Sequence, residues 1–183
     1  MPRYVLTGAP GTGKTTVLAQ LADRLTIVEE PARGIIAEHM ASTGEPGLDH
    51  RPGLFVSRLI AKSVENYHSV SETEIGVFDR GLPDCVAYAT ITGVDPGKAL
   101  KAASTLRYEN PVFVAHPWEE IYAQDDMRRA TYSQVEEFHA HLVRAYAELG
   151  YELLELPKAS VGERAAFVAD AIDSTAKGPR SSG

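Results

Sequence analysis

The 183-residue sequence has little cysteine, no excess of positive charge and no long apolar segment. Its single cysteine, Cys85, cannot form an intrachain disulfide, which excludes a disulfide-stapled secreted fold. Lysine and arginine total 18 against 25 aspartates and glutamates, so the net charge is −7 and a basic nucleic-acid-binding surface is not expected. No run of about 18 apolar residues occurs, and no signal-peptide pattern opens the sequence. We therefore expect a cytoplasmic protein that binds neither nucleic acid nor a membrane.

What the sequence does contain is the composition of a globular domain, with 44% hydrophobic and 23% charged residues. Short apolar segments typical of strands alternate with segments of helical periodicity. This alternation predicts an α/β fold, in which helices cover both faces of a parallel sheet. Residues 1–176 are expected to form a single domain, and residues 177–183 a flexible tail.

The expected elements follow from periodicity and from helix-capping residues. The strands are expected at residues 3–7, 26–29, 75–78, 111–115 and 151–154. Helices are expected at 14–24, 34–40, 54–70 and 85–91, with a loop at 42–53. Two further helices are expected to open with capping boxes, from Ser133 to Glu136 and from Ser160 to Glu163.

The segment after the first expected strand fits the phosphate-loop pattern G-x-x-x-x-G-K-[ST]. Its glycines let backbone N–H groups turn inward around a phosphate, and the following helix N-terminus adds partial positive charge. In this pattern Lys14 contacts the β- and γ-phosphates, and the Thr15 hydroxyl binds Mg²⁺. The alternative, a glycine-rich turn with a chance lysine, does not explain the strand–loop–helix context. The predicted ATP-binding residues are Gly8, Ala9, Pro10, Gly11, Thr12, Gly13, Lys14, Thr15 and Thr16.

Carboxylates follow the second and third expected strands. Glu29 and Glu30 end the second strand, where a carboxylate can act as general base toward a substrate hydroxyl. Pro31 fixes the turn and favours Glu30, whereas Glu29 fits a solvated turn better. Asp79 follows the third strand and is a predicted Mg²⁺ ligand together with the phosphate-loop threonine; its alternative role is a helix cap. Arg80 is predicted to reach phosphate oxygens or to pair with an acid.

Arg33 lies close after the predicted base and is a candidate substrate contact, with a surface ion pair as the alternative. The predicted substrate-binding set is Glu30, Arg33 and Arg80. Asp84 is expected to cap the next helix, and Cys85 to be buried and inert. The six histidines show no spacing that predicts a metal site.

Residues 117–132 are polar and precede a well-capped helix, which is typical of a lid. Arg128 and Arg129 lie where a closing lid would stabilise transition-state charge and exclude water. The alternative is an exposed helix in which these arginines pair with neighbouring aspartates.

Several segments resemble one family: VLTGAPGTGKTT, EEPARGIIAE, VFDRGLPDCVAYA, HPWEEIYAQDDMRR and GYELLELP. They are similar to small bacterial AAA-type P-loop ATPases related to the NadR-type ribosylnicotinamide kinases. The resemblance implies a three-layer P-loop NTPase fold with a five-stranded parallel sheet flanked by helices. It also implies a base-like role for Glu30, a magnesium and phosphate role for Asp79 and Arg80, and a lid role for Arg128 and Arg129.

These observations predict a Mg²⁺-ATP-dependent small-molecule kinase that phosphorylates a hydroxyl of a nucleoside-like or natural-product acceptor. The alternative is a nucleotide-dependent regulatory ATPase or switch that acts on a protein partner. Either function is compatible with a homodimer. The predicted catalytic residues are Lys14, Glu30, Asp79, Arg80, Arg128 and Arg129.

Overall fold

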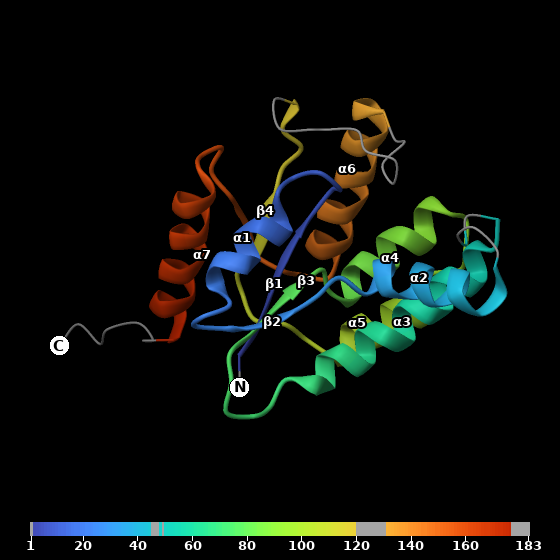
Figure 1. The fold of residues 1–183 in the computed structure, drawn as a ribbon, viewed down its shortest axis with the longest axis horizontal. Coiled ribbons are helices and arrows are strands. Elements are labelled where there is room, and N and C mark those ends of the chain that lie inside the picture. The colour runs from blue at the N-terminus through green and yellow to red at the C-terminus, as the bar shows by residue number, and fades with distance from the viewer. Residues whose placement is uncertain (1, 45–47, 49, 120–130, 177–183) are drawn as a thin grey trace.

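A five-stranded parallel sheet forms the centre of the molecule (Figure 1). The computed structural model describes residues 2–44, 48, 50–119 and 131–176. The strand order is β2-β3-β1-β4-β5, and every pairing is parallel. This architecture confirms the predicted α/β fold. The strands are β1 (Arg3–Gly8), β2 (Thr26–Val28), β3 (Gly76–Asp79), β4 (Val112–Ala115) and β5 (Leu153–Glu155).

Helices cover both faces of this sheet. Successive side chains of β1 point to opposite faces, so Tyr4 and Leu6 join one apolar cluster and Val5 joins the other. Helices α1 (Lys14–Leu21) and α7 (Val161–Ala176) cover the first face, on the left in Figure 1. Helices on the other side are α2 (Pro31–Thr43), α3 (Pro52–Ser69), α4 (Leu82–Ile91), α5 (Gly97–Thr105) and α6 (Tyr132–Glu148). Within the described residues, no helix is both long and apolar enough to span a membrane.

The parallel pairing places the ends of β1, β2 and β3 at the same edge of the sheet. Leu6 of β1 is in register with Asp79 of β3, and Val28 of β2 is in register with Phe78. The loop after β1, the residues after β2 and the end of β3 therefore meet at one edge. In open parallel sheets this edge is where ligands bind.

Three helices on the second face begin earlier than periodicity predicts, and α3 does so by two residues, at Pro52. Helix α2 spans Pro31–Thr43 rather than 34–40, because Pro31 occupies its first turn and Gly44, with a φ of 71°, ends it. Helix α4 begins at Leu82 rather than at residue 85, because the Asp84 carboxylate caps its first turn. The predicted cap at Asp84 is therefore confirmed.

The capping boxes of α6 and α7 have different outcomes. The predicted box from Ser160 to Glu163 is confirmed, because each side chain accepts a bond from the other residue's backbone N–H. The box of α6 joins Thr131 and Gln134, so the predicted pair of Ser133 and Glu136 is wrong. Both pairs fit the same sequence pattern, and the β conformation of residue 131 decides between them.

The thiol of Cys85 is buried on α4, as predicted. Burial raises its pKa to about 12, which keeps the thiol neutral and unreactive.

Candidate active site

The loop after β1 has the backbone geometry that its sequence pattern predicts. A Cβ atom on Gly8 would lie 2.2 Å from the carbonyl oxygen of Ala115, and its φ is 141°, so only glycine fits. Gly13, with a φ of 77°, precedes α1 and turns the chain into that helix. These two glycines let the loop wrap closely over the end of β4. In phosphate-binding loops, such a turn directs backbone N–H groups toward the phosphate.

Lys14, the first residue of α1, is buried against the phosphate loop. Its Nζ donates to the carbonyl oxygens of Gly8 and Ala9 at 2.9 Å each, and to Oγ1 of Thr12 at 3.4 Å. Burial and the nearby charge of Arg80 lower the pKa of Lys14 to about 8, although Asp79 and other carboxylates oppose this effect. The Lys14 amine is therefore mostly protonated at pH 7, and its positive charge can attract an anion bound at the loop.

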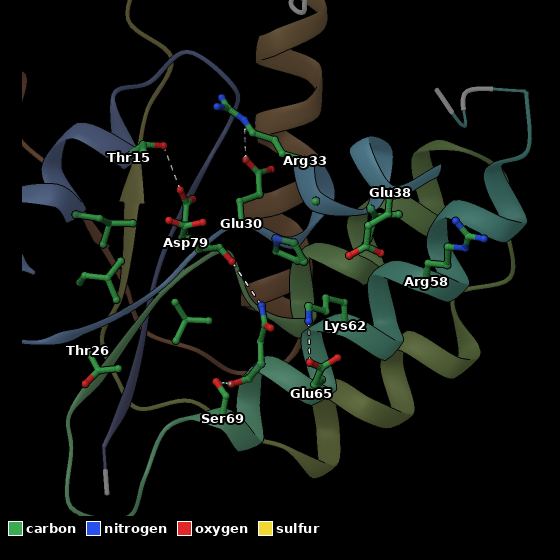
Figure 2. Close-up of a pocket in the computed structure, with 18 of the residues that line it drawn as sticks. Thr15, Thr26, Glu30, Arg33, Glu38, Arg58, Lys62, Glu65, Ser69 and Asp79 are labelled. Atoms are coloured by element: carbon green, nitrogen blue, oxygen red, sulfur yellow. Dashed lines mark hydrogen bonds and ion pairs between the residues drawn. The ribbon is translucent and has the colours of Figure 1, made fainter. Parts of the chain in front are cut away.

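Thr15 and Asp79 face each other across the loop and the end of β3 (Figure 2). The Thr15 hydroxyl donates to Oδ2 of Asp79 at 3.3 Å. Oδ1 of Asp79 is buried and has no hydrogen-bond partner among the described residues. Burial raises the pKa of Asp79, and the charge of Lys14 opposes that rise. A buried carboxylate oxygen without a donor, next to a hydroxyl, fits an Mg²⁺ ligand set completed by phosphate and water oxygens.

No group of three or more histidine, cysteine, aspartate or glutamate side chains that could hold a metal occurs in the part of the chain that the structure describes. This result does not conflict with Mg²⁺ bound through one carboxylate, because Mg²⁺ at phosphate sites keeps few protein ligands.

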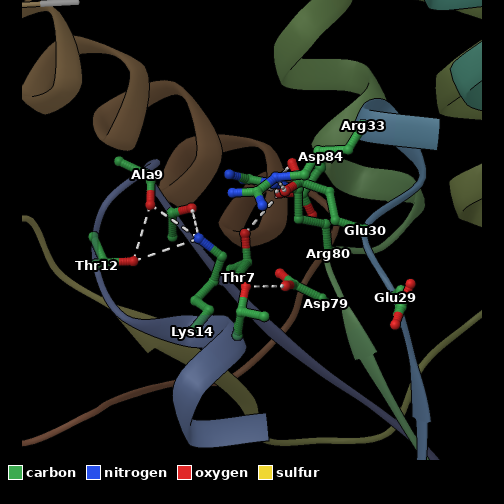
Figure 3. A network of polar contacts seen from close by, with 12 residues as sticks. Thr7, Ala9, Thr12, Lys14, Glu29, Glu30, Arg33, Asp79, Arg80 and Asp84 are labelled. Atoms are coloured by element: carbon green, nitrogen blue, oxygen red, sulfur yellow. Dashed lines mark hydrogen bonds and ion pairs between the residues drawn. The ribbon is translucent and has the colours of Figure 1, made fainter. Parts of the chain in front are cut away.

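Glu30 and Arg80 form an ion pair beside the phosphate loop (Figure 3). The Arg80 Nε atom donates to Oε1 of Glu30 at 2.6 Å, and Arg33 lies 4.0 Å from the other oxygen. Burial acts to raise the pKa of Glu30, but the charges of Arg80 and Lys14 outweigh it and lower that pKa. Glu30 is therefore ionised at neutral pH. The neighbouring Glu29 is exposed and lies away from this network, so Glu30 is the only one of the two glutamates that belongs to it.

A cleft of about 810 Å³ connects these groups. Residues 10–16 of the phosphate loop form its floor, and Glu30, Arg33 and Arg80 line the same space. A second hollow, of about 1000 Å³, runs along β2 between α1 and α3 (Figure 2). Both spaces include Thr15, Glu30 and Arg33 in their walls, but only the smaller one reaches Lys14. The smaller cleft therefore joins the phosphate loop and its lysine to Glu30 and Arg80.

The sequence of residues 3–164 matches a family described as an AAA domain. The chain belongs to this AAA domain family. No curated protein matches the sequence significantly.

Solved structures show which fold this AAA domain shares. The NadR protein in complex with NR superposes with a TM-score of 0.69 and 19% identity, over 94% of this chain and 50% of that chain. The AAA domain thus spans about half the length of the NadR protein. Thymidylate kinase from Ehrlichia chaffeensis gives a TM-score of 0.60 and 13% identity, over 94% of this chain and 99% of its own. Deoxyadenosine kinase from M. mycoides gives a TM-score of 0.63 and 12% identity, over 94% of this chain and 99% of its own. These likenesses show that the AAA domain has the P-loop kinase fold.

The structure brings most of the predicted site residues to one edge of the sheet. The phosphate loop, Glu30, Arg33 and Arg80 line the smaller cleft. Asp79 lines the adjoining larger hollow, together with Thr15, Glu30 and Arg33. The predicted lid at 117–132 lies largely outside the described residues, and so do Arg128 and Arg129.

Arg164 is a residue of this site that sequence patterns do not reveal. It is buried on α7, its Nη2 atom donates to the carbonyl oxygen of Thr12 at 2.9 Å, and it lines the cleft. Burial lowers its pKa. The capping box that precedes it gives no hint of phosphate binding, and 152 positions separate Arg164 from the loop that it contacts. Only its place after the last strand, at the ligand-binding edge, could have suggested it.

Proposed function

We propose that this AAA domain is a Mg²⁺-ATP-dependent kinase that phosphorylates a hydroxyl of a small nucleoside-like or natural-product acceptor. The observation that carries the proposal is the position of Glu30. Its ionised carboxylate lines the same cleft as Lys14 and the rest of the phosphate loop, where a hydroxyl acceptor needs a base. A deoxyadenosine kinase and the NadR protein share the fold, and the latter is also solved with NAD and AMP-PNP, which supports an adenine-nucleotide donor.

In the proposed reaction, the acceptor hydroxyl oxygen forms a bond to the γ-phosphorus. The bond from that phosphorus to the oxygen that bridges it to the β-phosphorus breaks, and ADP leaves with the electron pair. The hydroxyl proton passes to the carboxylate of Glu30. Lys14 and Arg80 stabilise the negative charge on the transferring group, because both are cations that line the cleft.

Thr15 and Asp79 would hold the Mg²⁺ ion. When bound, the ion neutralises charge on the β- and γ-phosphate oxygens. Oδ1 of Asp79, which accepts no hydrogen bond from the described residues, and the Thr15 hydroxyl offer it oxygen ligands of the kind that Mg²⁺ prefers.

The charges of the site favour an acceptor without a phosphate group. Among the described residues, the guanidinium of Arg80 is already shared by the carboxylates of Glu30 and Asp84. Arg33 lies beside Glu30 as well. Beside Glu30, a nucleoside monophosphate would therefore meet a carboxylate and two arginines that already pair with carboxylates. The remaining walls of this part of the cleft are apolar or aromatic and comprise Ala32, Ile36, Tyr88 and Trp118.

A panel of acceptors tests the proposed function. ADP release from Mg²⁺-ATP is measured with nucleosides, their 5′-monophosphates, ribosylated vitamins and hydroxylated antibiotics. We expect release to depend on an unphosphorylated hydroxyl compound, with mass spectrometry showing a gain of one phosphoryl group. Slow hydrolysis that no acceptor accelerates would contradict the kinase and favour the regulatory ATPase. A preference for the 5′-monophosphates would contradict the charge argument alone.

The affinity for ATP is expected to fall as the pH rises above about 8. The pKa of Lys14 is about 8 before nucleotide binds, so at higher pH the ammonium that attracts the phosphates is lost. A bound triphosphate favours the charged form, so ATP binding must then take up a proton. The dissociation constant should rise by about tenfold per pH unit above this pKa. Trp118, the only tryptophan, lines the cleft and provides a fluorescence signal for titrations between pH 7 and pH 9.5.

Lys14→Arg is the matched control for this pH dependence. Arginine stays charged throughout the range, so the variant should bind ATP with little change between pH 7 and pH 9.5. If the ATP dissociation constant of the variant rose with pH as steeply as that of the wild type, a group other than Lys14 would cause the pH dependence.

A further inference from the structure

The carboxylate of Asp84 receives more hydrogen bonds than a helix cap requires. The Gly81 backbone N–H donates to Oδ2 at 2.8 Å, and this bond alone caps α4. The Thr7 hydroxyl donates to Oδ1 at 2.7 Å, and the Tyr146 hydroxyl donates to Oδ2 at 2.5 Å. Arg80 supplies the fourth donor, because its Nη1 atom lies 3.2 Å from Oδ1. One buried carboxylate thus joins β1, the turn after β3, α4 and α6.

Arg80 is held between Asp84 and Glu30 (Figure 3). The side chains of Arg80 and Asp84 are 4% and 2% exposed, whereas that of Glu30 is 17% exposed and lines the cleft. The backbone of Arg80 has a φ of 74°, a conformation that residues other than glycine rarely adopt. Such a conformation persists where surrounding contacts enforce it, and it concentrates at functional sites. The two carboxylates supply those contacts.

The charges around Arg80 explain why two carboxylates are useful. Burial opposes the guanidinium charge, but Tyr88, Glu30 and Asp84 together keep the pKa of Arg80 above its ordinary value. From α6, the ring of Phe138 lies 5.7 Å from the guanidinium carbon. A guanidinium paired with Glu30 alone would neutralise that carboxylate more fully and weaken it as a base. Sharing with Asp84 leaves the base fixed in place but only partly neutralised.

We propose that Asp84 is a positioning residue for phosphoryl transfer: its buried carboxylate fixes the Arg80 guanidinium, and Arg80 in turn fixes the Glu30 carboxylate beside the phosphate loop. This inference rests on the proposed kinase function. Tyr146 supports the same arrangement from α6, and Thr7 supports it from the strand that leads into the phosphate loop.

Two variants and one matched control test the proposal. Asp84→Asn keeps the shape of the side chain and removes its charge. Tyr146→Phe removes one of the four hydrogen-bond donors to the Asp84 carboxylate. Tyr108→Phe is the control, because the Tyr108 hydroxyl is also buried at the start of α4 and accepts from the Leu82 N–H at 3.2 Å. Loss of either tyrosine hydroxyl removes one buried hydrogen bond, but only Tyr146 contacts Asp84.

The first readout is a titration of the Glu30 side-chain carboxyl by ¹³C NMR, with the signal assigned by its loss in Glu30→Gln. We expect the Asp84→Asn variant to titrate at lower pH than the wild type, because a negative charge is removed and Arg80 pairs with Glu30 alone. Tyr108→Phe should titrate as the wild type does. If the titration midpoint of Glu30 did not move in folded Asp84→Asn, the proposal would be overturned. Loss of a purely structural residue would lower the melting temperature but leave that midpoint unchanged.

The second readout is kinetic and uses an acceptor found in the panel. In Asp84→Asn, kcat should fall by about 10- to 100-fold, because the Arg80–Glu30 pair loses its anchor and shifts the base from its position. The acid limb of the kcat/KM profile should move to lower pH, as the NMR midpoint does. Tyr146→Phe should show a smaller loss of kcat, and Tyr108→Phe none. If the wild type transfers no phosphoryl group to any acceptor, the kinase function fails, and the NMR titration still decides the role of Asp84.

Discussion

Glu30→Gln is expected to reduce acceptor-dependent phosphoryl transfer by about 100- to 10,000-fold, while ATP binding changes little. Glutamine keeps the length of the side chain, and its carbonyl oxygen still accepts the hydrogen bond from Arg80 Nε. The amide cannot take a proton from the acceptor hydroxyl, so the loss falls on kcat. The measurements are ADP release with an active acceptor and the Trp118 fluorescence response to ATP.

Glu29→Gln is the matched control for this prediction. The two glutamates are adjacent in the sequence, but Glu29 is exposed and lies outside the network around Arg80. The control should retain the wild-type rate within about twofold, because surface substitutions of this kind change little. If the two variants lost activity equally, the loss would reflect the net charge of the segment, and Glu30 would not be the base.

The sheet could be predicted from the sequence because its strands have distinctive local patterns. The inner strand β4 reads VFVA and is buried on both faces, so it appears as a continuous apolar run. Helix boundaries were less predictable, because capping depends on backbone conformation. The predicted helix at 34–40 was too short at both ends, because α2 starts at Pro31 and is ended only by Gly44.

The candidate site was predictable where its residues belong to local patterns. The phosphate loop is contiguous, Glu30 follows β2 and Asp79 ends β3, so parallel pairing brings them together. The roles of Asp84 and Arg164 depend on contacts between distant segments. Asp84 contacts Thr7, 77 positions away, and the sequence supports only its role as a cap. Arg164 has the appearance of a surface arginine until the fold places it against the phosphate loop.

Lys14→Met is expected to abolish measurable ATP binding and to reduce turnover by about 1000-fold or more, because the main cation of the phosphate loop is lost. Methionine keeps most of the side-chain volume, so the substitution leaves no large cavity beside the phosphate loop. Binding is measured by Trp118 fluorescence and turnover by ADP release with an active acceptor.

Lys62→Met on α3 is the control for the loss of a lysine. Lys62 lines the larger hollow along β2, is partly exposed, and pairs with Glu65 at 2.7 Å. ATP binding should stay within about twofold of the wild type, because surface ion pairs contribute little. An equal loss in Lys62→Met would place the phosphates in the larger hollow instead of at the loop.

The stability of Lys14→Met is expected to change in the opposite direction to its activity. Burial and the charge of Arg80 lower the pKa of Lys14 from 10.5 to about 8, so the charged lysine destabilises the folded protein by about 3 kcal/mol at pH 7. Replacing the charged lysine removes this destabilisation. Part of the stability gained is lost again, because the carbonyl oxygens of Gly8 and Ala9 each lose a hydrogen-bond donor, at a cost of about 1 kcal/mol each. The net gain of about 1 kcal/mol should raise the melting temperature by about 2–4 °C. A fall of several degrees would show that Lys14 mainly stabilises the loop. A rise would mark it as a residue kept for ligand binding at the expense of stability.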